Sequence, residues 1–383
     1  MKKIVVLLAL VFITILSSAT FAAEPIKIAY LAGLTGEFAP YGRAESNAAE
    51  MAVNEINKAG GVLGRPLELV IYDTKSRPED AVNAVRRMIE SDKVCVIMGA
   101  NTSSINLATA PLVERGKVPQ IGTATTNPLV TVDENGRVRP FSFRICFTDP
   151  YQGTIAAEFA KNTLGKEKAA VLHNIGSDYA QGLREYFIES YSKLGGQVVV
   201  DEGYRDADVD FRAQLALVQK SGANVLFLPG LGRDMALIIK QAREVGLNDL
   251  EIVGGDGYGE FMNDIAGQSM IGTYWITHTN MDDPNMAPVF KRYEETFNEE
   301  AKEFGNVTLA YDLTYWVADA IGRAGSTDGT AIAKAIEETK GLELKHFTLT
   351  MDPATHNPHN KPAIILKIGD DIRSHYFMTV EPK

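Results

Sequence analysis

Hydrophobic positions along the chain follow two different periods. Short apolar runs rich in Val, Ile and Leu predict buried strands at IKIAYL (26–31), LELVIYD (67–73), VCVIMG (94–99), VPQIG (118–122), AAVLHN (169–174), QVVVDE (197–202), NVLFLPG (224–230) and EIVGG (251–255). The segments between them place apolar residues three and four apart, and most of these segments end at glycine, as helices do. Strands that alternate with helices indicate an α/β fold built on parallel sheets.

The two halves of this pattern repeat each other. INKAGG (56–61) matches YSKLGG (191–196), the strand that ends at Gly99 matches the one that ends at Gly230, and Gly122 matches Gly254. The three pairs come in the same order and at nearly the same separation. We therefore expect two doubly wound lobes of one architecture.

Four loops follow predicted strands at equivalent places in the two halves. They are ANTSS (100–104) and GTATTN (122–127) in the first half, and LGRD (231–234) and GDGYG (255–259) in the second. Ligands of open parallel sheets bind beyond the carboxyl ends of the strands. If the lobes face each other, the four loops line one cleft, and two lobes joined by a hinge can close on a ligand.

The last hundred residues predict that the chain passes between the lobes more than once. Strong helical patterns cover 285–325, and three β-like runs, HFTLTMD, AIILKIGDD and SHYFMTV, follow without helices between them. We predict three crossings. The first lobe then comprises residues 25–144 plus 276–345, and the second comprises 145–275 plus 346–383.

The N-terminus indicates an exported protein, and the overall charge limits the partners that it can have. Residues 1–22 combine Lys2 and Lys3, an apolar stretch and small residues before Ala22, which is the pattern of a cleaved signal peptide. The formal net charge is −11, with 49 acidic and 38 basic residues. Such a chain, without a basic run, argues against nucleic acid or an anionic membrane as partner.

The two first-half loops are rich in hydroxyl groups. Thr102 and Ser103 stand where a strand ends and the helix INLATAPLVERG begins, and Thr126 belongs to GTATTNP. One interpretation is helix capping. The other is a cradle for a carboxylate, because a helix N-terminus offers free N–H groups and the positive end of its dipole.

The second half offers an acid and an aromatic residue. Asp256 lies among glycines in GGDGYG, and Tyr179 begins a helix at another strand end. Asp256 is either a turn residue or the acceptor for an ammonium group, which would make the cleft suited to an α-amino acid. Tyr179 and Tyr41 are candidates for aromatic walls of the cleft or for structural tyrosines.

Other chemistry finds little support. Export permits a disulfide between Cys95 and Cys146, but both lie in apolar runs, which favour two buried free thiols. THNPH, with His356 and His359, reads as a turn in preference to a metal site. The chain lacks G-x-S-x-G, P-loop and G-x-G-x-x-G motifs, so neither an enzyme nor a cofactor is expected.

Several motifs together resemble one family. They are IAYLAGLTGEFAPYG, AVNEINKAGGVLGRPLELVIYD, TNPLVT, FRICFTDPYQG, DYAQGL, DFRAQL, IIKQAREVGL, GGDGY and DPATHNP, spread over the whole mature chain. In this order the chain resembles the type I periplasmic binding proteins of branched-chain amino acid ABC transporters, the leucine/isoleucine/valine-binding family. The resemblance implies two lobes joined by a three-strand hinge, transporter permease subunits as partners, and a monomer.

The family's ligand-binding positions can be carried over residue by residue. The resemblance implies that Ser103 holds the ligand carboxylate and that the Ala124 carbonyl and Thr126 contact the head group. Tyr179 would close over the ligand, Tyr41 would lie near its side chain, and Asp256 would contact the ammonium group in place of the family's glutamate.

One position departs from the family pattern. Leu231 stands where relatives often have tyrosine, and this change, together with Asp256, alters the ammonium end of the site. The ligand could therefore be leucine, isoleucine or valine, or another amino acid. Amides, urea and aromatic carboxylates, and a sensing role without transport, remain as alternatives, although Asp256 disfavours a pure acid. Hinge positions are expected near Phe147, Trp275 and Thr348.

Overall fold

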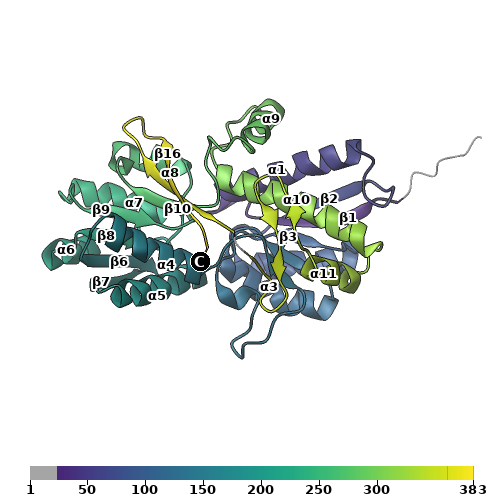
Figure 1. Cartoon of the computed structure of the whole chain (residues 1–383), viewed down its shortest axis with the longest axis horizontal. Coiled ribbons are helices and arrows are strands. Elements are labelled where there is room, and N and C mark those ends of the chain that lie inside the picture. The colour runs from purple at the N-terminus through teal and green to yellow at the C-terminus, as the bar shows by residue number, and fades with distance from the viewer. Residues whose placement is uncertain (1–23, 360, 383) are drawn as a thin grey trace, which may run out of the picture.

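The computed structural model describes residues 24–359 and 361–382, which form two lobes side by side (Figure 1). The predicted signal peptide, residues 1–22, lies outside the described residues. Over the described ranges, no helix is long and apolar enough to cross a membrane. Each lobe is built on its own sheet, and the α/β fold class predicted from the sequence is confirmed.

The first sheet has five parallel strands in the order β2-β1-β3-β4-β5. Their bounds are β1 Ile26–Ala32, β2 Leu67–Asp73, β3 Ile97–Gly99, β4 Gln120–Gly122 and β5 Ser142–Arg144. Strand β1 lies inside the sheet and is almost wholly buried, which agrees with its continuous apolar sequence.

The second sheet has seven strands in the order β16-β15-β10-β9-β8-β6-β7. Their bounds are β6 Lys168–Asn174, β7 Gln197–Tyr204, β8 Val225–Leu228, β9 Glu251–Gly254, β10 Tyr274–Thr277, β15 Ala363–Ile368 and β16 Ser374–Val380. From β7 to β10 the strands are parallel and repeat the order of the first sheet, whereas β15 and β16 are antiparallel additions. The internal repeat seen in the sequence is therefore a repeat of topology.

Helices cover both faces of each sheet (Figure 1). Those of the first lobe are α1 Ala39–Lys58, α2 Pro78–Arg87, α3 Ser103–Gly116, α9 Ala287–Phe297, α10 Phe304–Ala324 and α11 Gly329–Glu337. Those of the second are α4 Asp149–Glu158, α5 Asp178–Lys193, α6 Arg212–Ser221, α7 Gly232–Glu244 and α8 Phe261–Ala266. Short helical turns of other types lie at Met88–Asp92, Pro128–Val130, Phe159–Thr163 and Gly267–Met270.

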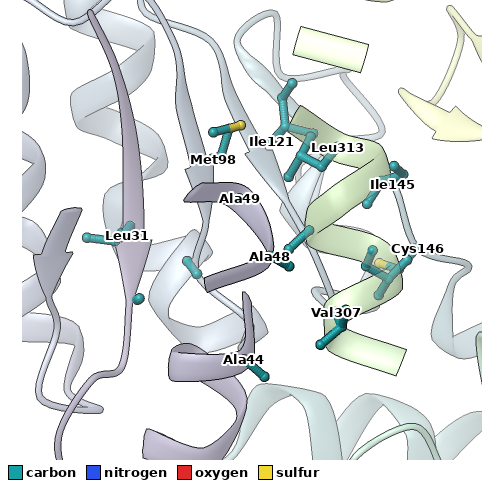
Figure 2. Close-up of a cluster of buried hydrophobic side chains, with 14 of the residues drawn as sticks. Leu31, Ala44, Ala48, Ala49, Met98, Ile121, Ile145, Cys146, Val307 and Leu313 are labelled. Atoms are coloured by element: carbon teal, nitrogen blue, oxygen red, sulfur yellow. The ribbon is translucent and has the colours of Figure 1, made fainter. Parts of the chain in front are cut away.

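Helix α10 packs against α1 on one face of the first sheet, although the two helices are far apart in sequence. Figure 2 shows the small residues Ala48 and Ala49 of α1 facing this core, together with Val307 and Leu313 of α10. All four are fully buried. Alanines on α1 let the backbone of a second helix approach closely, so that one apolar layer covers the sheet.

The chain crosses between the lobes in three segments, after β5, after β10 and before β15. Phe147 lies in the first segment. Trp275 belongs to β10 and Thr348 to β12 Thr348–Leu349, so neither of these two predicted hinge positions lies in a crossing.

Two predicted lobe boundaries shift as a result. Strand β10 extends the second sheet to Thr277, and the hairpin of β13 Met351–Asp352 and β14 Asn357–Pro358 packs beside β5 of the first sheet. His356 stacks on Phe143, with ring centroids 4.2 Å apart. Residues 346–358 therefore lie with the first sheet, because an isolated two-stranded hairpin is at best marginally stable and has to pack on a neighbour. The lobe limits otherwise stay a prediction.

The remaining short strand is β11 Leu342–Glu343, which pairs with β12.

The structure places both cysteines and both histidines of the sequence analysis, and of these only His359 is exposed. Cys95 and Cys146 are both buried free thiols, and burial raises the pKa of each to about 12. His356 is buried, with its Nδ1 atom 3.1 Å from the Ser142 carbonyl oxygen. Among the described residues, no group of three or more His, Cys, Asp or Glu side chains could hold a metal ion.

Candidate functional site

The first hydroxyl-rich loop begins where β3 ends. Gly99 has a φ of +91°, and a Cβ atom there would lie 2.5 Å from the ring of Tyr30, so the turn requires glycine. Thr102 then occupies the position before α3, but its hydroxyl makes no capping hydrogen bond and is buried without a partner. Capping therefore does not account for the Thr102 side chain.

The second hydroxyl-rich loop follows β4 and is tied to the first. The backbone N–H of Asn127 donates to Ser103 Oγ at 3.2 Å. The hydroxyl group of Thr125, like that of Thr102, is buried and has no hydrogen-bond partner in the protein, whereas that of Thr126 is buried beside the Asp149 carboxyl group. Such groups are costly to leave unpaired, and a polar ligand between the lobes would satisfy them.

Arg144, on β5, holds this loop in place with several hydrogen bonds. Its fully buried guanidinium donates to the Thr125 carbonyl oxygen at 2.5 Å, to the Asn127 carbonyl oxygen at 2.7 Å and to Thr131 Oγ1 at 3.1 Å. Burial lowers the pKa of Arg144 from its usual value. The sequence analysis assigned no role to this residue, although a charged residue inside the apolar run FRICF is a local signal.

The second lobe presents Asp256 just after β9. Its side chain is only 3% exposed and accepts from Gln152 Nε2 at 3.0 Å, while Gln152 Oε1 accepts from the Asp256 N–H at 2.6 Å. The other carboxylate oxygen lies 3.1 Å from His278 Nε2. Burial lowers the pKa of His278 to about 4, so this ring is neutral near pH 7 and donates from Nε2 to the carboxylate.

The hydroxyl groups of Tyr179 and Tyr41 both form hydrogen bonds with the backbone of Gly257. Tyr179 accepts from the Gly257 N–H at 3.2 Å. Tyr41, from the other lobe, donates to the Gly257 carbonyl oxygen at 2.5 Å and accepts from the Gly232 N–H at 2.9 Å. Burial raises the pKa of both tyrosines. Tyr41 thus connects the lobes as well as standing near the cleft.

The lobes touch at other points, so the structure is a closed form. Asn127 Nδ2 donates to the Asp178 carbonyl oxygen at 2.8 Å, and the Asp178 N–H donates to Ser104 Oγ at 3.2 Å. The Phe261 N–H donates to Glu303 Oε1 at 3.3 Å. Such contacts across two lobes can exist together only when the cleft is shut.

An interlobe pocket brings most of the predicted site residues together. Six of the eight line it, namely Tyr41, Thr102, Ala124, Tyr179, Leu231 and Asp256. Ser103 and Thr126 do not line the pocket, but both are completely buried in the loops that form it. A second pocket adjoins the first and shares Ala124, Asp256 and Asn306 with it.

Asn306 is a pocket residue that the sequence analysis missed. It lies on α10 and donates from Nδ2 to Glu45 Oε1 at 2.8 Å. Glu45 is fully buried and also accepts from Tyr30 and Thr123, and burial raises its pKa to about 7. Because the amide nitrogen faces Glu45, the carbonyl oxygen of Asn306 is left for the pocket. Nothing local in the sequence marks this contact, which spans 261 positions.

The site therefore has two chemically different sides. One carries hydroxyl groups and a helix N-terminus, and the other carries the Asp256 carboxylate. The described residues that line the first pocket include no lysine or arginine, whereas Lys302 lines the adjoining one. This arrangement suits a small molecule with a negative end and a positive end. The binding roles of the individual residues stay a prediction.

Comparisons with known proteins identify the family of this chain. A family model described as "Periplasmic binding protein" matches residues 25–371. The chain is 30% identical over 352 residues to the leucine-, isoleucine-, valine-, threonine- and alanine-binding protein of Pseudomonas aeruginosa, covering 88% of this chain and 91% of that protein.

Solved structures give the same result. A leucine binding protein, LivK, from Thermotoga maritima superposes with a TM-score of 0.85 at 32% identity, covering 93% of this chain and 99% of that one. The substrate binding protein LivJ of Streptococcus pneumoniae, in complex with isoleucine, gives a TM-score of 0.85 at 29% identity and covers 94% and 100%. The chain belongs to the periplasmic binding protein family.

Proposed function

We propose that this protein is the exported solute-binding component of an ABC importer and that its cleft binds a zwitterionic α-amino acid. The observation that carries the proposal is that one pocket is lined both by the Asp256 carboxylate and by a buried hydroxyl group without a hydrogen-bond partner, that of Thr102. The relatives named above, whose names include binding of leucine, isoleucine and other amino acids, support it.

The proposal is tested by a ligand screen. Thermal-shift measurements compare leucine, isoleucine, valine, threonine and alanine with their deaminated acids. At least one of the amino acids should stabilise the protein, and none of the deaminated acids should. A ligand present at 100 times its Kd stabilises the folded protein by about 2.7 kcal/mol. Small-angle scattering should show compaction when the same ligand is added to the open form. Stabilisation by the acids but by no amino acid would contradict the zwitterion proposal.

The hydroxyl side of the cleft gives a prediction for two residues. Ser103→Ala and Thr126→Ala should each weaken amino acid binding by about 1–2 kcal/mol, because each removes a hydrogen bond to a charged group. Isothermal titration calorimetry measures the loss. Ser46→Ala is the matched control. Ser46, on α1, is buried as Ser103 and Thr126 are, but it lines neither of the two interlobe pockets. Normal affinity of the double variant would place the ligand carboxylate elsewhere.

Tyr41 gives a prediction about closure. Tyr41→Phe removes the hydroxyl group that donates to the Gly257 carbonyl oxygen and accepts from the Gly232 N–H, and leaves these two backbone groups of the other lobe with their direct hydrogen bond of 3.2 Å. We expect the closed form to lose about 0.5–1.5 kcal/mol, the net contribution of an intramolecular hydrogen bond. Affinity should then fall by a similar factor for every ligand, as measured by calorimetry over the set of amino acids.

The control for this prediction is Tyr72→Phe. Tyr72 donates its hydroxyl to Asp92 within the first lobe, at 2.7 Å, so its loss should not change closure. If Tyr41→Phe changes affinity for one amino acid and not for others, the hydroxyl acts on the ligand and not on the contact between the lobes.

A further inference from the structure

The pocket that adjoins the first one is lined by three buried side chains to which the proposed head-group site assigns no role. They are His278, Glu303 and Asn306, which are 2%, 6% and 8% exposed. His278 follows β10, and the other two lie at the start of α10. Each of them leaves one polar atom without a hydrogen-bond partner, as the next two paragraphs describe atom by atom. Buried polar groups are costly to leave unpaired.

Hydrogen bonds within the protein determine which atoms of His278 and Asn306 are free. The neutral His278 ring donates from Nε2 to the Asp256 carboxylate at 3.1 Å, so Nδ1 carries a lone pair, and this atom is buried without a partner. Asn306 uses its amide nitrogen to donate to Glu45 Oε1 at 2.8 Å, and Oδ1 accepts nothing from the described residues. Both free atoms are therefore hydrogen-bond acceptors.

The third free atom is an oxygen of Glu303. Oε1 accepts from the Phe261 N–H at 3.3 Å, whereas Oε2 is buried without a partner. A Cβ atom on Gly259, which also lines the adjoining pocket, would lie 2.3 Å from Oε2, so this oxygen lies at the pocket wall. Burial raises the pKa of Glu303 to about 8. Near neutral pH, Oε2 therefore accepts a hydrogen bond when the group is ionised and donates one when it is protonated.

Two other charged side chains of the adjoining pocket already have partners. Lys302 lies 3.2 Å from Asp264, and about half of its side chain is exposed to solvent. The carboxylate of Glu260 accepts from Asn263 Nδ2 at 2.7 Å and from the Ser374 N–H at 3.1 Å. The groups that lack a partner in this pocket are therefore the three described above, and two of them are acceptors only.

We propose that the adjoining pocket is the side-chain subsite of the ligand and that it takes an amino acid whose side chain ends in an N–H donor, either a carboxamide or an amine. This assignment rests on the proposed function, because the head group has to bind at Thr102 and Asp256 in the first pocket. Asp256 and Asn306 line both pockets, so the ligand side chain extends past them into the adjoining one.

The free atoms discriminate between classes of side chain. N–H groups donate to His278 Nδ1 and Asn306 Oδ1. A carboxamide can in addition accept from protonated Glu303, and an ammonium group can pair with the ionised form. A hydrocarbon side chain leaves all three groups unpaired, and a carboxylate side chain faces two acceptors. A site built to hydrogen-bond a ligand group rejects the analogue that lacks it, because its own buried polar groups are then left unpaired.

The first experiment measures wild-type affinity by calorimetry for pairs of amino acids of similar shape. The pairs are asparagine with leucine, glutamine with glutamate, and lysine with norleucine. In at least one pair, the member with the side-chain N–H donor should bind roughly tenfold more tightly or better. Preference for asparagine or glutamine identifies a carboxamide subsite, and preference for lysine identifies an amine subsite. A preference below tenfold in all three pairs would overturn the inference.

The second experiment repeats the preferred pair with Asn306→Leu, which removes one acceptor. The ratio of the two affinities should fall severalfold, whereas damage to the fold alone would weaken both ligands and leave the ratio unchanged. Asn47→Leu is the control, because Asn47 is half-buried on α1, donates to the Tyr293 hydroxyl at 3.1 Å and lines neither pocket.

The outcomes separate this inference from the proposed function. An unchanged ratio in Asn306→Leu, or tighter binding of leucine, glutamate or norleucine than of its partner, would overturn the side-chain subsite and leave the proposed function standing. If neither these amino acids nor the five of the thermal-shift screen bind wild type, the proposed function is wrong, and the subsite with it.

Discussion

Asp256→Asn should lower the affinity for the amino acid at least tenfold. The change keeps the shape of the side chain and its contact with Gln152 but removes the charge that the ligand ammonium group needs. Truncating one partner of a buried charged pair commonly costs about 2–5 kcal/mol. His278, at 3.1 Å and neutral near pH 7, cannot supply the missing negative charge.

The decisive comparison uses two ligands with the same carboxylate. Calorimetry should show that Asp256→Asn loses the amino acid but binds the deaminated acid as well as wild type does, or better. Asp312→Asn is the control, because Asp312 is equally buried, accepts from two backbone N–H groups and lines neither of these pockets. Normal amino acid binding by Asp256→Asn would make Asp256 a turn residue.

The folded protein should become less stable from pH 5 to pH 8, and Glu303 should account for part of this loss. Burial raises the pKa of Glu303 to about 8, and one of its oxygens has no partner. A carboxyl group whose pKa is higher in the folded than in the unfolded state stabilises the fold most below its unfolded value, near 4.5. That contribution is lost as the pH rises through about 8, at up to about 1.4 kcal/mol per pH unit.

Glu303→Gln tests this prediction. Glutamine keeps an oxygen for the Phe261 N–H and carries no charge at any pH. Urea unfolding at pH 5, 6, 7 and 8 should show that the free energy of unfolding of the variant increases relative to that of wild type as the pH rises. Glu294→Gln, at an exposed position of α9, should leave the wild-type profile unchanged. Parallel profiles for wild type and Glu303→Gln would mean that Glu303 does not titrate in this range.

Local sequence patterns determined the parts of this protein that depend on neighbours along the chain. The apolar runs predicted the strands, and glycine and hydroxyl residues marked the loops at their carboxyl ends, because buried strands and tight turns impose their requirements within a few residues. Repetition of these patterns predicted two similar lobes. The same loops contain Thr102, Ala124 and Asp256, which line the pocket.

Only the tertiary structure decided which distant groups meet. The bond from Tyr41 to Gly257 spans 216 positions, and that from Asn306 to Glu45 spans 261. Likewise, the contacts of Asp256 with Gln152 and His278 depend on how three segments that are distant in sequence pack together. The β13–β14 hairpin beside β5 was misplaced for the same reason, since its short apolar pattern fits either lobe. Periodicity reports which face of an element is buried, but not which other element covers that face.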